Sequence, residues 1–161
     1  MSTPHIRLAR AVDAAAACEV LRRSIVELCA ADHGNDAQFL SRWLANKTPE
    51  NVAGWIGDPG NVVYVAVADG RIVGVAAMTR AGMVTLNYVA PDARFKGVSK
   101  ALLAALERTA ADLGLAQCQL ESTKTARPFY EAAGYREQDG AAGGCSAEVA
   151  GSCRPMMKIL G

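Results

Sequence analysis

The sequence is poor in the residues that mark a metal centre or a disulfide framework. It has only two histidines, His5 and His33, and its five cysteines are scattered without a C-x-x-C pair. An odd number of unpaired cysteines predicts small thiols in a reducing compartment rather than disulfides or a zinc site. The two histidines alone do not complete a metal site. We therefore expect no metal.

An excess of charge of one sign is also missing. The chain carries 17 Lys and Arg against 16 Asp and Glu, a net charge of +1, and these residues do not form a basic cluster. Binding to nucleic acid or to an anionic membrane surface needs a basic face. We expect neither nucleic acid nor membrane among the partners.

Long apolar runs are absent as well. No stretch reaches the roughly 18 apolar residues that cross a bilayer, and residues 1–5 lack the basic and apolar regions of a signal peptide. These absences favour a cytoplasmic protein. The length of 161 residues, 51% of them hydrophobic, suits a single domain over 1–161 with one substantial core.

The first part of the chain shows a short strand followed by helical periodicity. Apolar and basic residues alternate over 5–10, which predicts a half-buried strand. Asp13 is a good N-cap for a helix that ends near Ala31. Helical spacing resumes over 39–44, and Thr48 followed by Pro49 predicts a short helix to Ile56.

The rest of the chain alternates strands and helices. Runs 62–68 and 71–78 are separated by Asp-Gly, a strong hairpin signal. The remaining expected elements are a strand at 83–90, a helix at 97–113, a strand at 115–121, a helix at 125–133, a strand from Tyr135, a loop or irregular hairpin at 140–151 and a strand at 154–160. The order β-α-α-β-β-β-α-β-α-β-β predicts an α+β fold, a mixed, mostly antiparallel sheet flanked by helices.

The segment between strand 83–90 and the following helix has the features of an anion site. Free N–H groups and the helix dipole favour negative charge at a helix N-terminus, and Gly97 lets a phosphate approach the backbone. Arg94, Lys96 and Lys100 add positive charge there. A glycine near a helix start is also a common turn residue, so this spacing alone is a weak signal.

Two longer strings sharpen this interpretation. The string V-x-P-x-x-R-x-x-G-V-S-x-x-L runs from Val89 to Leu102, and it resembles the acetyl-CoA signature of the GNAT acyltransferase family. The string from Thr123 to Tyr135, T-x-x-A-x-x-F-Y-E-x-x-G-Y, is similar to the second signature of that family. Ser99 replaces the usual Gly or Ala, and Thr123 stands where many members have Asn.

The resemblance implies acetyl-CoA as co-substrate, a GNAT-like fold and a set of contacts. Strand 83–90 would splay from strand 115–121, so that the pantetheine arm pairs with the backbone of Asn87 and Val89, while the pyrophosphate lies on the amides of the helix N-terminus. The implied co-substrate contacts are Asn87, Tyr88, Val89, Arg94, Phe95, Lys96, Gly97, Val98, Ser99, Lys100 and Thr123.

The resemblance also implies a general acid but leaves the general base open. Tyr130 aligns with the tyrosine that protonates the departing CoA thiolate, and the alternative is that Tyr130 and Phe129 merely pack that helix. Family members often carry a carboxylate on the strand equivalent to 83–90, and no Asp or Glu occurs between Arg80 and Pro91. The candidates are Glu121, Asp32, His33 and Asp36, each of which could instead be a surface or capping residue, and a water chain could replace a dedicated base.

The implied activity is transfer of an acetyl group to an amine of a small acceptor by direct attack in a ternary complex, without an acyl-enzyme. The alternative is a non-catalytic acyl-CoA-binding sensor, which the missing strand carboxylate favours. The acidic residues of 25–55 would suit a cationic amine, or simply form a solvated loop. A protein acceptor remains open, and a homodimer is a possibility that the resemblance raises.

Two other enzyme classes are excluded by their own motifs. The string G-V-S-K-A from Gly97 superficially resembles the nucleophile elbow of α/β-hydrolases, but that fold needs a histidine after the serine, and both histidines precede Ser99. A P-loop nucleotide hydrolase needs G-x-x-x-x-G-K-[ST], which the chain does not contain.

Overall fold

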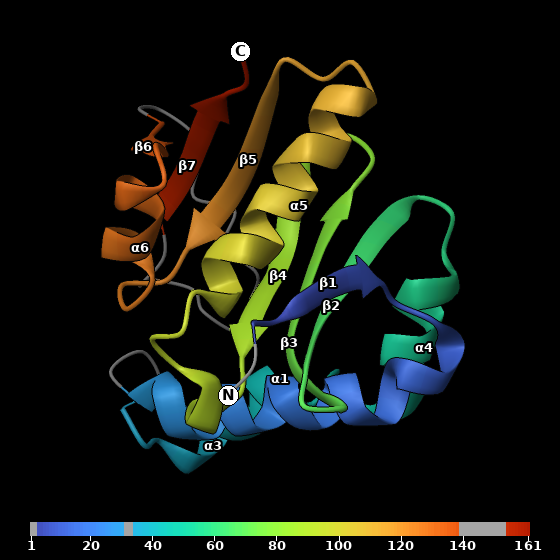
Figure 1. Ribbon diagram of the computed structural model, residues 1–161. Helices are drawn as coiled ribbons and strands as arrows, with labels where there is room; N and C mark the ends of the chain where they lie inside the picture. The colour runs from blue at the N-terminus through green and yellow to red at the C-terminus, as the bar shows by residue number, and fades with distance from the viewer. Residues whose placement is uncertain (1–2, 31–33, 139–153) are drawn as a thin grey trace.

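The computed structural model describes residues 3–30, 34–138 and 154–161. Within these ranges seven strands form one sheet in the order β1-β2-β3-β4-β5-β7-β6 (Figure 1). The strands are β1 (His5–Leu8), β2 (Asn61–Ala68), β3 (Arg71–Thr79), β4 (Met83–Val89), β5 (Gln117–Ser122), β6 (Arg136–Glu137) and β7 (Arg154–Ile159). Neighbouring strands are antiparallel except β4 and β5, which are parallel. The expected mixed, mostly antiparallel sheet is confirmed.

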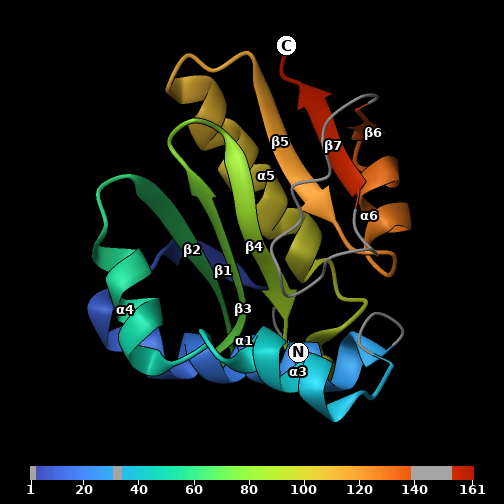
Figure 2. The same ribbon diagram turned by 180° about the vertical axis from the view of Figure 1, so that it is seen from behind.

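Helices cover both faces of this sheet. They are α1 (Ala14–Leu28), α3 (Ala37–Leu44), α4 (Pro49–Gly57), α5 (Val98–Asp112) and α6 (Arg127–Ala132), with short 3-10 turns at η1 (Ala11–Asp13) and η2 (Pro91–Ala93). Helix α5 lies on the near face of the sheet in Figure 1, and α4 lies on the near face in the reverse view of Figure 2. None of the helices in the described part of the chain is long and apolar enough to cross a membrane.

The segment before β2 contains more helices than the expected order allowed. That order counted two helices there, although the spacing indicated three helical segments, ending near Ala31, at 39–44 and at 48–56, and the described residues form three helices, α1, α3 and α4. A short turn after Leu44 separates α3 from α4, and Thr48 begins α4 by accepting a hydrogen bond from the Asn51 amide at 3.1 Å. Pro49 occupies the first turn, as expected.

Asp13 precedes α1, as expected of an N-cap, but its carboxylate does not cap that helix. It accepts two hydrogen bonds from the Arg7 guanidinium, at 2.7 and 3.0 Å, and one from the Arg10 amide at 2.7 Å. These bonds, the Arg7 bond above all, hold the pKa of Asp13 below its ordinary value although burial opposes the shift. The carboxylate therefore ties β1 to the start of α1.

Strand β3 lies at the centre of the core. Its residues from Val73 to Met78 are all buried, because α5 packs on one face of the strand and α1 on the other. It is joined to β2 by the expected hairpin, in which Asp69 and Gly70 have φ of 53° and 75°, the left-handed values of a two-residue turn. The expected segment 140–151 lies outside the described residues.

Candidate active site

Strands β4 and β5 separate after a short stretch of parallel pairing. Met83 pairs with Gln119 and Val84 with Leu120, and no pair follows. Pairing of β4 with β3 continues to Val89. The two strands diverge toward the end of β4 in both views (Figures 1 and 2). The expected splay is confirmed, and it opens the edge of β4 over residues 85–89.

A β-bulge sits at the start of this open edge. Ala77 pairs with Leu86 and Met78 with Val84, so Thr85 is an extra residue on β4. The Thr85 hydroxyl donates to the Ala77 carbonyl oxygen at 3.3 Å. Bulges turn the backbone and side chains of a strand in new directions and often lie beside active sites. The sequence gives no signal for this bulge.

The N-terminus of α5 has the geometry of an anion site. Gly97 is the N-cap with φ of 79°, and no side chain caps the helix. The first helical hydrogen bond is donated by the Ala101 amide to the Gly97 carbonyl at 3.0 Å, so the amides of 98–100 precede the helical ladder. A Cβ on Gly97 would meet nothing within 4 Å. An anion therefore has room to reach these amides.

A second glycine positions this helix. A Cβ on Gly74 of β3 would lie 2.6 Å from Cγ1 of Val98 and 2.9 Å from Cδ1 of Leu102. The first two turns of α5 therefore rest directly on the backbone of β3. Sequence reasoning did not find Gly74, although a glycine inside a strand often marks such a close approach.

A cavity of about 530 Å³ lies between the splayed strand, the loop before α5, α6 and α1. Its wall contains every residue expected to contact the co-substrate except Lys96. It also contains Tyr130. The wall residues are Ser24, Leu28, Cys29, Asn87, Tyr88, Val89, Ala93, Arg94, Phe95, Gly97, Val98, Ser99, Lys100, Thr123, Thr125, Ala126, Phe129 and Tyr130.

Three wall residues on α1 were not anticipated. Ser24 and Leu28 lie on α1 and Cys29 is its C-cap, and all three line the cavity. They belong to no motif, because their place depends on how α1 packs across the sheet. The charged wall residues, Arg94 and Lys100, are both basic. The cavity as described therefore favours an anionic ligand.

Tyr130 is a buried residue of this wall, with 8% of its surface exposed. Its ring packs edge to face on Phe129 and Tyr135, with centroid distances of 5.1 and 5.6 Å. Burial raises the pKa of Tyr130 to about 12, and a hydrogen bond from the Asn87 side chain opposes the shift. The phenol is therefore kept protonated at physiological pH.

Asn87 links this phenol to the open edge of β4. Its Oδ1 atom is buried and has no hydrogen-bond partner among the residues that the structure describes. An unsatisfied buried acceptor is costly, and a ligand with an N–H or O–H group would satisfy it. Thr123 accepts a hydrogen bond from the Ala126 amide at 3.3 Å, so its hydroxyl also orders the start of α6.

The candidate bases are not brought to one place. Glu121 lies on β5 in register with Pro155. Its neighbour Leu120 is buried, and alternation along the strand puts Glu121 on the opposite face of the sheet. Glu121 is absent from the described wall of the cavity. Asp36 accepts from the amides of Gln38 and Phe39 as the N-cap of α3, and residues 32–33 lie outside the described ranges.

A sheet splayed beside a basic helix N-terminus is the arrangement that the resemblance to acyl-CoA-dependent transferases led us to expect. The family model described as an acetyltransferase (GNAT) domain matches residues 29–146. The chain therefore belongs to the GNAT acetyltransferase family, as its two signature strings indicated, and takes an acyl-CoA and an acceptor. No curated protein matches the sequence.

Solved structures share this fold. A GCN5-related N-acetyltransferase from Rhodopseudomonas palustris has 25% identity and a TM-score of 0.84, covering 99% of this chain and 98% of that one. A PaiA N-acetyltransferase from Thermoplasma acidophilum in complex with coenzyme A has 20% identity and a TM-score of 0.79 over 99% of both chains. The ribosomal-protein-S18-alanine N-acetyltransferase of Escherichia coli has 16% identity and a TM-score of 0.71, covering 98% of this chain and 94% of that one.

Proposed function

We propose that this protein transfers an acetyl group from acetyl-CoA to the amine of a small acceptor, by direct attack in a ternary complex. The observation that carries the proposal is the position of Tyr130. Its buried, protonated phenol lines the same cavity as the open edge of β4 and the N-terminus of α5. A buried proton donor beside the open edge of β4 suits the leaving thiolate rather than the nucleotide.

The wall of the cavity provides contacts for each part of the co-substrate. The pyrophosphate takes the amides of 98–100 and the charges of Arg94 and Lys100. The pantetheine arm lies along 87–89, where β4 lacks a strand partner on its β5 side. An amide N–H of that arm would satisfy the buried Oδ1 atom of Asn87.

The chemistry needs one bond made and one bond broken. The amine nitrogen attacks the thioester carbonyl carbon, and backbone N–H groups beside the Thr85 bulge stabilise the negative oxygen. The C–N bond then forms fully as the C–S bond breaks, and the sulfur takes the Tyr130 proton. The proton that the amine nitrogen loses returns to the phenolate through water, so that the products are an N-acetyl amine and a free thiol.

Glu121 is the residue we propose to remove the first proton from an ammonium acceptor, acting through water. The support is its place on β5 next to the splay, one residue past the last pair of β5 with β4. The substitution Glu121→Gln should lower kcat and shift the pH profile while the Kd for acetyl-CoA stays unchanged. If kcat and the profile both stay at wild-type values, water alone carries the proton.

The experiment that tests the proposal is a thiol-release assay with acetyl-CoA and a panel of amines. Tyr130→Phe should lower kcat by about 10²- to 10⁴-fold, the usual contribution of a general acid, with an unchanged Kd for acetyl-CoA. The control is Tyr64→Phe, which also removes one hydroxyl group, but one that bonds Thr109 at 2.7 Å in the core.

Three outcomes separate the alternatives. A loss of turnover in Tyr130→Phe but not in Tyr64→Phe supports the mechanism. Equal turnover of wild type and Tyr130→Phe contradicts the role of the phenol. Tight binding of acetyl-CoA without turnover of any amine indicates the non-catalytic sensor.

A separate measurement tests direct attack. Ser24 and Cys29 line the cavity and carry groups that could accept an acetyl group. If the amine attacks the thioester directly, mass spectrometry under turnover should show no acetylated protein.

A further inference from the structure

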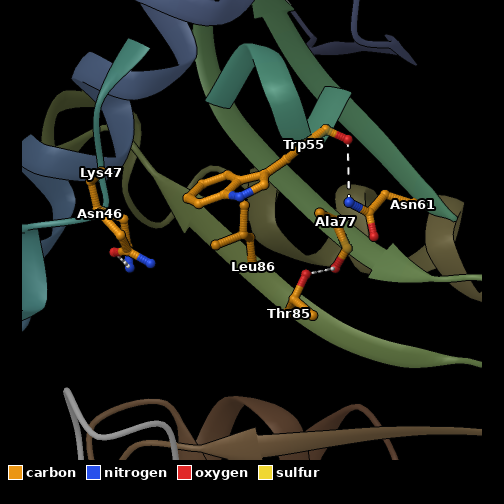
Figure 3. Close-up of a pocket in the computed structure, with 7 residues that line it drawn as sticks. All are labelled: Asn46, Lys47, Trp55, Asn61, Ala77, Thr85 and Leu86. Carbon is orange, nitrogen blue, oxygen red and sulfur yellow. Dashed lines mark hydrogen bonds between the residues drawn. The ribbon is translucent and has the colours of Figure 1, made fainter. Parts of the chain in front are cut away.

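A second cavity, of about 310 Å³, lies on the sheet face opposite α5 (Figure 3). It is bounded by the link between α3 and α4, by α4, by the start of β2, and by β3 and β4. The residues that line it are Asn46, Lys47, Trp55, Asn61, Ala77, Thr85 and Leu86. Its volume is at the lower end of the range for small-molecule sites.

The two cavities are lined by consecutive residues of β4. Thr85 and Leu86 line the second cavity, and the next residues along the strand, Asn87 to Val89, line the first. The bulge at Thr85 lies at this boundary. A molecule in the second cavity is therefore next to the open strand edge on which the proposed function places the thioester.

We propose that the second cavity holds the acceptor and selects small amines that also carry a carboxylate. This inference rests on the proposed function for the identity of the reaction, but its binding chemistry is read from the cavity itself. The cavity has donor groups at one end, acceptor groups at the other and an apolar wall between them.

The donor end is formed by Lys47 and Asn46. Lys47 has only 6% of its surface exposed, and its Nζ atom donates to the Asn46 Oδ1 atom at 2.8 Å. Figure 3 shows the polar ends of the two side chains together on one side of the cavity. The ammonium and the amide N–H groups are donors, and a carboxylate accepts from both.

The acceptor end lies across the cavity. The Asn61 amide donates to the Trp55 carbonyl at 3.3 Å, which directs its Oδ1 atom as an acceptor. The Thr85 hydroxyl donates to the Ala77 carbonyl at 3.3 Å, and its oxygen keeps acceptor lone pairs. These oxygens suit the N–H groups of an amine. The amine then lies at the bulge, beside the thioester, and the carboxylate lies at Lys47.

The apolar wall between the two ends determines which chemical group suits the middle of the ligand. The indole ring of Trp55 and the side chain of Leu86 face the cavity between the donor and acceptor ends (Figure 3). These surfaces suit a short apolar segment. The class of acceptor is therefore amino-acid-like, an amine and a carboxylate separated by a compact apolar part.

This inference replaces the cationic acceptor that the acidic residues of 25–55 suggested. Asp36 is used as a helix cap, Glu27 pairs with Arg23 at 3.5 Å, and Glu50 is exposed in the first turn of α4. Among the described residues of 25–55, the charged side chain that lines the cavity is instead the basic Lys47. A polyamine would bring a positive charge against a buried ammonium, which is unfavourable.

The test is calorimetric titration of matched product pairs in the absence of acetyl-CoA. The pairs are N-acetylglycine, N-acetylleucine and N-acetylphenylalanine, each against its carboxamide. At least one free acid should bind wild type tenfold or more tightly than its amide. Lys47→Met should bring the acid and the amide to the same Kd. Lys47→Arg should keep the preference, because it keeps the charge.

The matched control is Arg42→Met, which removes a positive charge from an exposed site on α3, outside the described cavity wall. It should leave the preference for the acid at its wild-type value. Equal binding of acid and amide in every pair, absence of binding of all six ligands, or an intact preference in Lys47→Met overturns the inference.

Failure of the proposed function gives a different result. If the proposed function is wrong, the protein does not bind acetyl-CoA or does not turn it over. The titrations with N-acetyl amino acids require neither acetyl-CoA binding nor turnover. The Kd for acetyl-CoA and the thermal unfolding midpoint of Lys47→Met show whether that variant is folded. If it is unfolded, Asn46→Ala takes its place and should lower the preference for the acid at least threefold.

Discussion

A Cβ atom on Gly74 would lie 2.6 Å from Cγ1 of Val98, the first residue of α5. Helix α5, whose N-terminus faces the cavity, can therefore lie this close to β3 only because residue 74 has no side chain. Added methyl groups in a packed core cost about 1–3 kcal/mol. We expect Gly74→Ala to lower the free energy of unfolding by about that amount and to weaken acetyl-CoA binding, as measured by denaturation and calorimetry.

The control for this prediction is Gly54→Ala in α4. A Cβ at Gly54 meets nothing within 4 Å, and alanine in a helix interior is more stable than glycine by about 0.5–1 kcal/mol. This variant should be slightly stabilised, with unchanged acetyl-CoA affinity. If Gly74→Ala binds acetyl-CoA as wild type does, the position of α5 does not depend on this contact.

The pKa of Tyr130 makes a prediction about alkaline pH. An ordinary phenol has a pKa near 10 and would lose its proton through that range, whereas burial raises the pKa of Tyr130 to about 12. The acid form therefore persists as pH rises through 10. We expect kcat to show no fall with a midpoint near 10, measured by thiol release between pH 7 and 10.5. A fall of kcat with a midpoint near pH 10 that is absent in Tyr130→Phe would show that Tyr130 loses its proton at the ordinary pKa of a phenol.

Phe95 has a strained left-handed backbone conformation and a side chain that is exposed to solvent. It is 88% exposed, has φ of 65°, and its ring lies 4.5 Å from the Arg94 guanidinium carbon. A left-handed conformation costs an L-residue about 1–2 kcal/mol, so a ligand contact is the simplest reason for it. Phe95→Gly should keep or raise the thermal unfolding midpoint while weakening acetyl-CoA binding several-fold.

The comparison ligand for that prediction is acetyl-pantetheine, which lacks the nucleotide. Its affinity should be the same for wild type and Phe95→Gly if Phe95 contacts the nucleotide end of the co-substrate. Equal losses for both ligands would place the contact elsewhere along the cavity.

The pair of Arg7 and Asp13 makes a prediction about acid pH. The pKa of Asp13 is lowered in the folded state, chiefly by the Arg7 hydrogen bond. The pair therefore stabilises the fold fully above the unfolded pKa near 3.9, and this stability is lost as pH falls through the lower folded value. Asp13→Asn should cost about 1–2 kcal/mol at pH 7, since Arg7 is partly exposed.

Denaturant titrations at pH 7 and at pH 3 measure this effect. The difference between wild type and Asp13→Asn should shrink at the lower pH. Asp112→Asn, which changes an exposed carboxylate on α5, should show little difference at either pH. A deficit of Asp13→Asn that is the same at both pH values would contradict the pairing.

The parts of the fold and site that could be predicted from sequence are those encoded locally. Asp69 and Gly70 form the expected hairpin turn because both positions need positive φ. The segment around Gly97 is a helix N-terminus because glycine takes the left-handed conformation there. The two signature strings placed Tyr130 in the same cavity as that segment.

The parts that could not be predicted depend on the relative positions of distant elements. The bulge at Thr85 depends on the register between β3 and β4. Ser24 lines the cavity because of the way α1 packs against the sheet. Lys47 looked like one charge in a polar loop, and only the packing of α3 and α4 shows that it is buried beside a cavity. None of these features has a local sequence pattern.

The most direct test of the central claim is calorimetric titration of acetyl-CoA into wild type, Gly97→Trp and Gly114→Trp. Both glycines have positive φ, 79° and 81°, and a Cβ at either meets nothing within 4 Å, but they lie at opposite ends of α5. Saturable binding that Gly97→Trp loses and Gly114→Trp keeps is the predicted result. Absence of binding in wild type, or equal binding by both variants, would contradict the account.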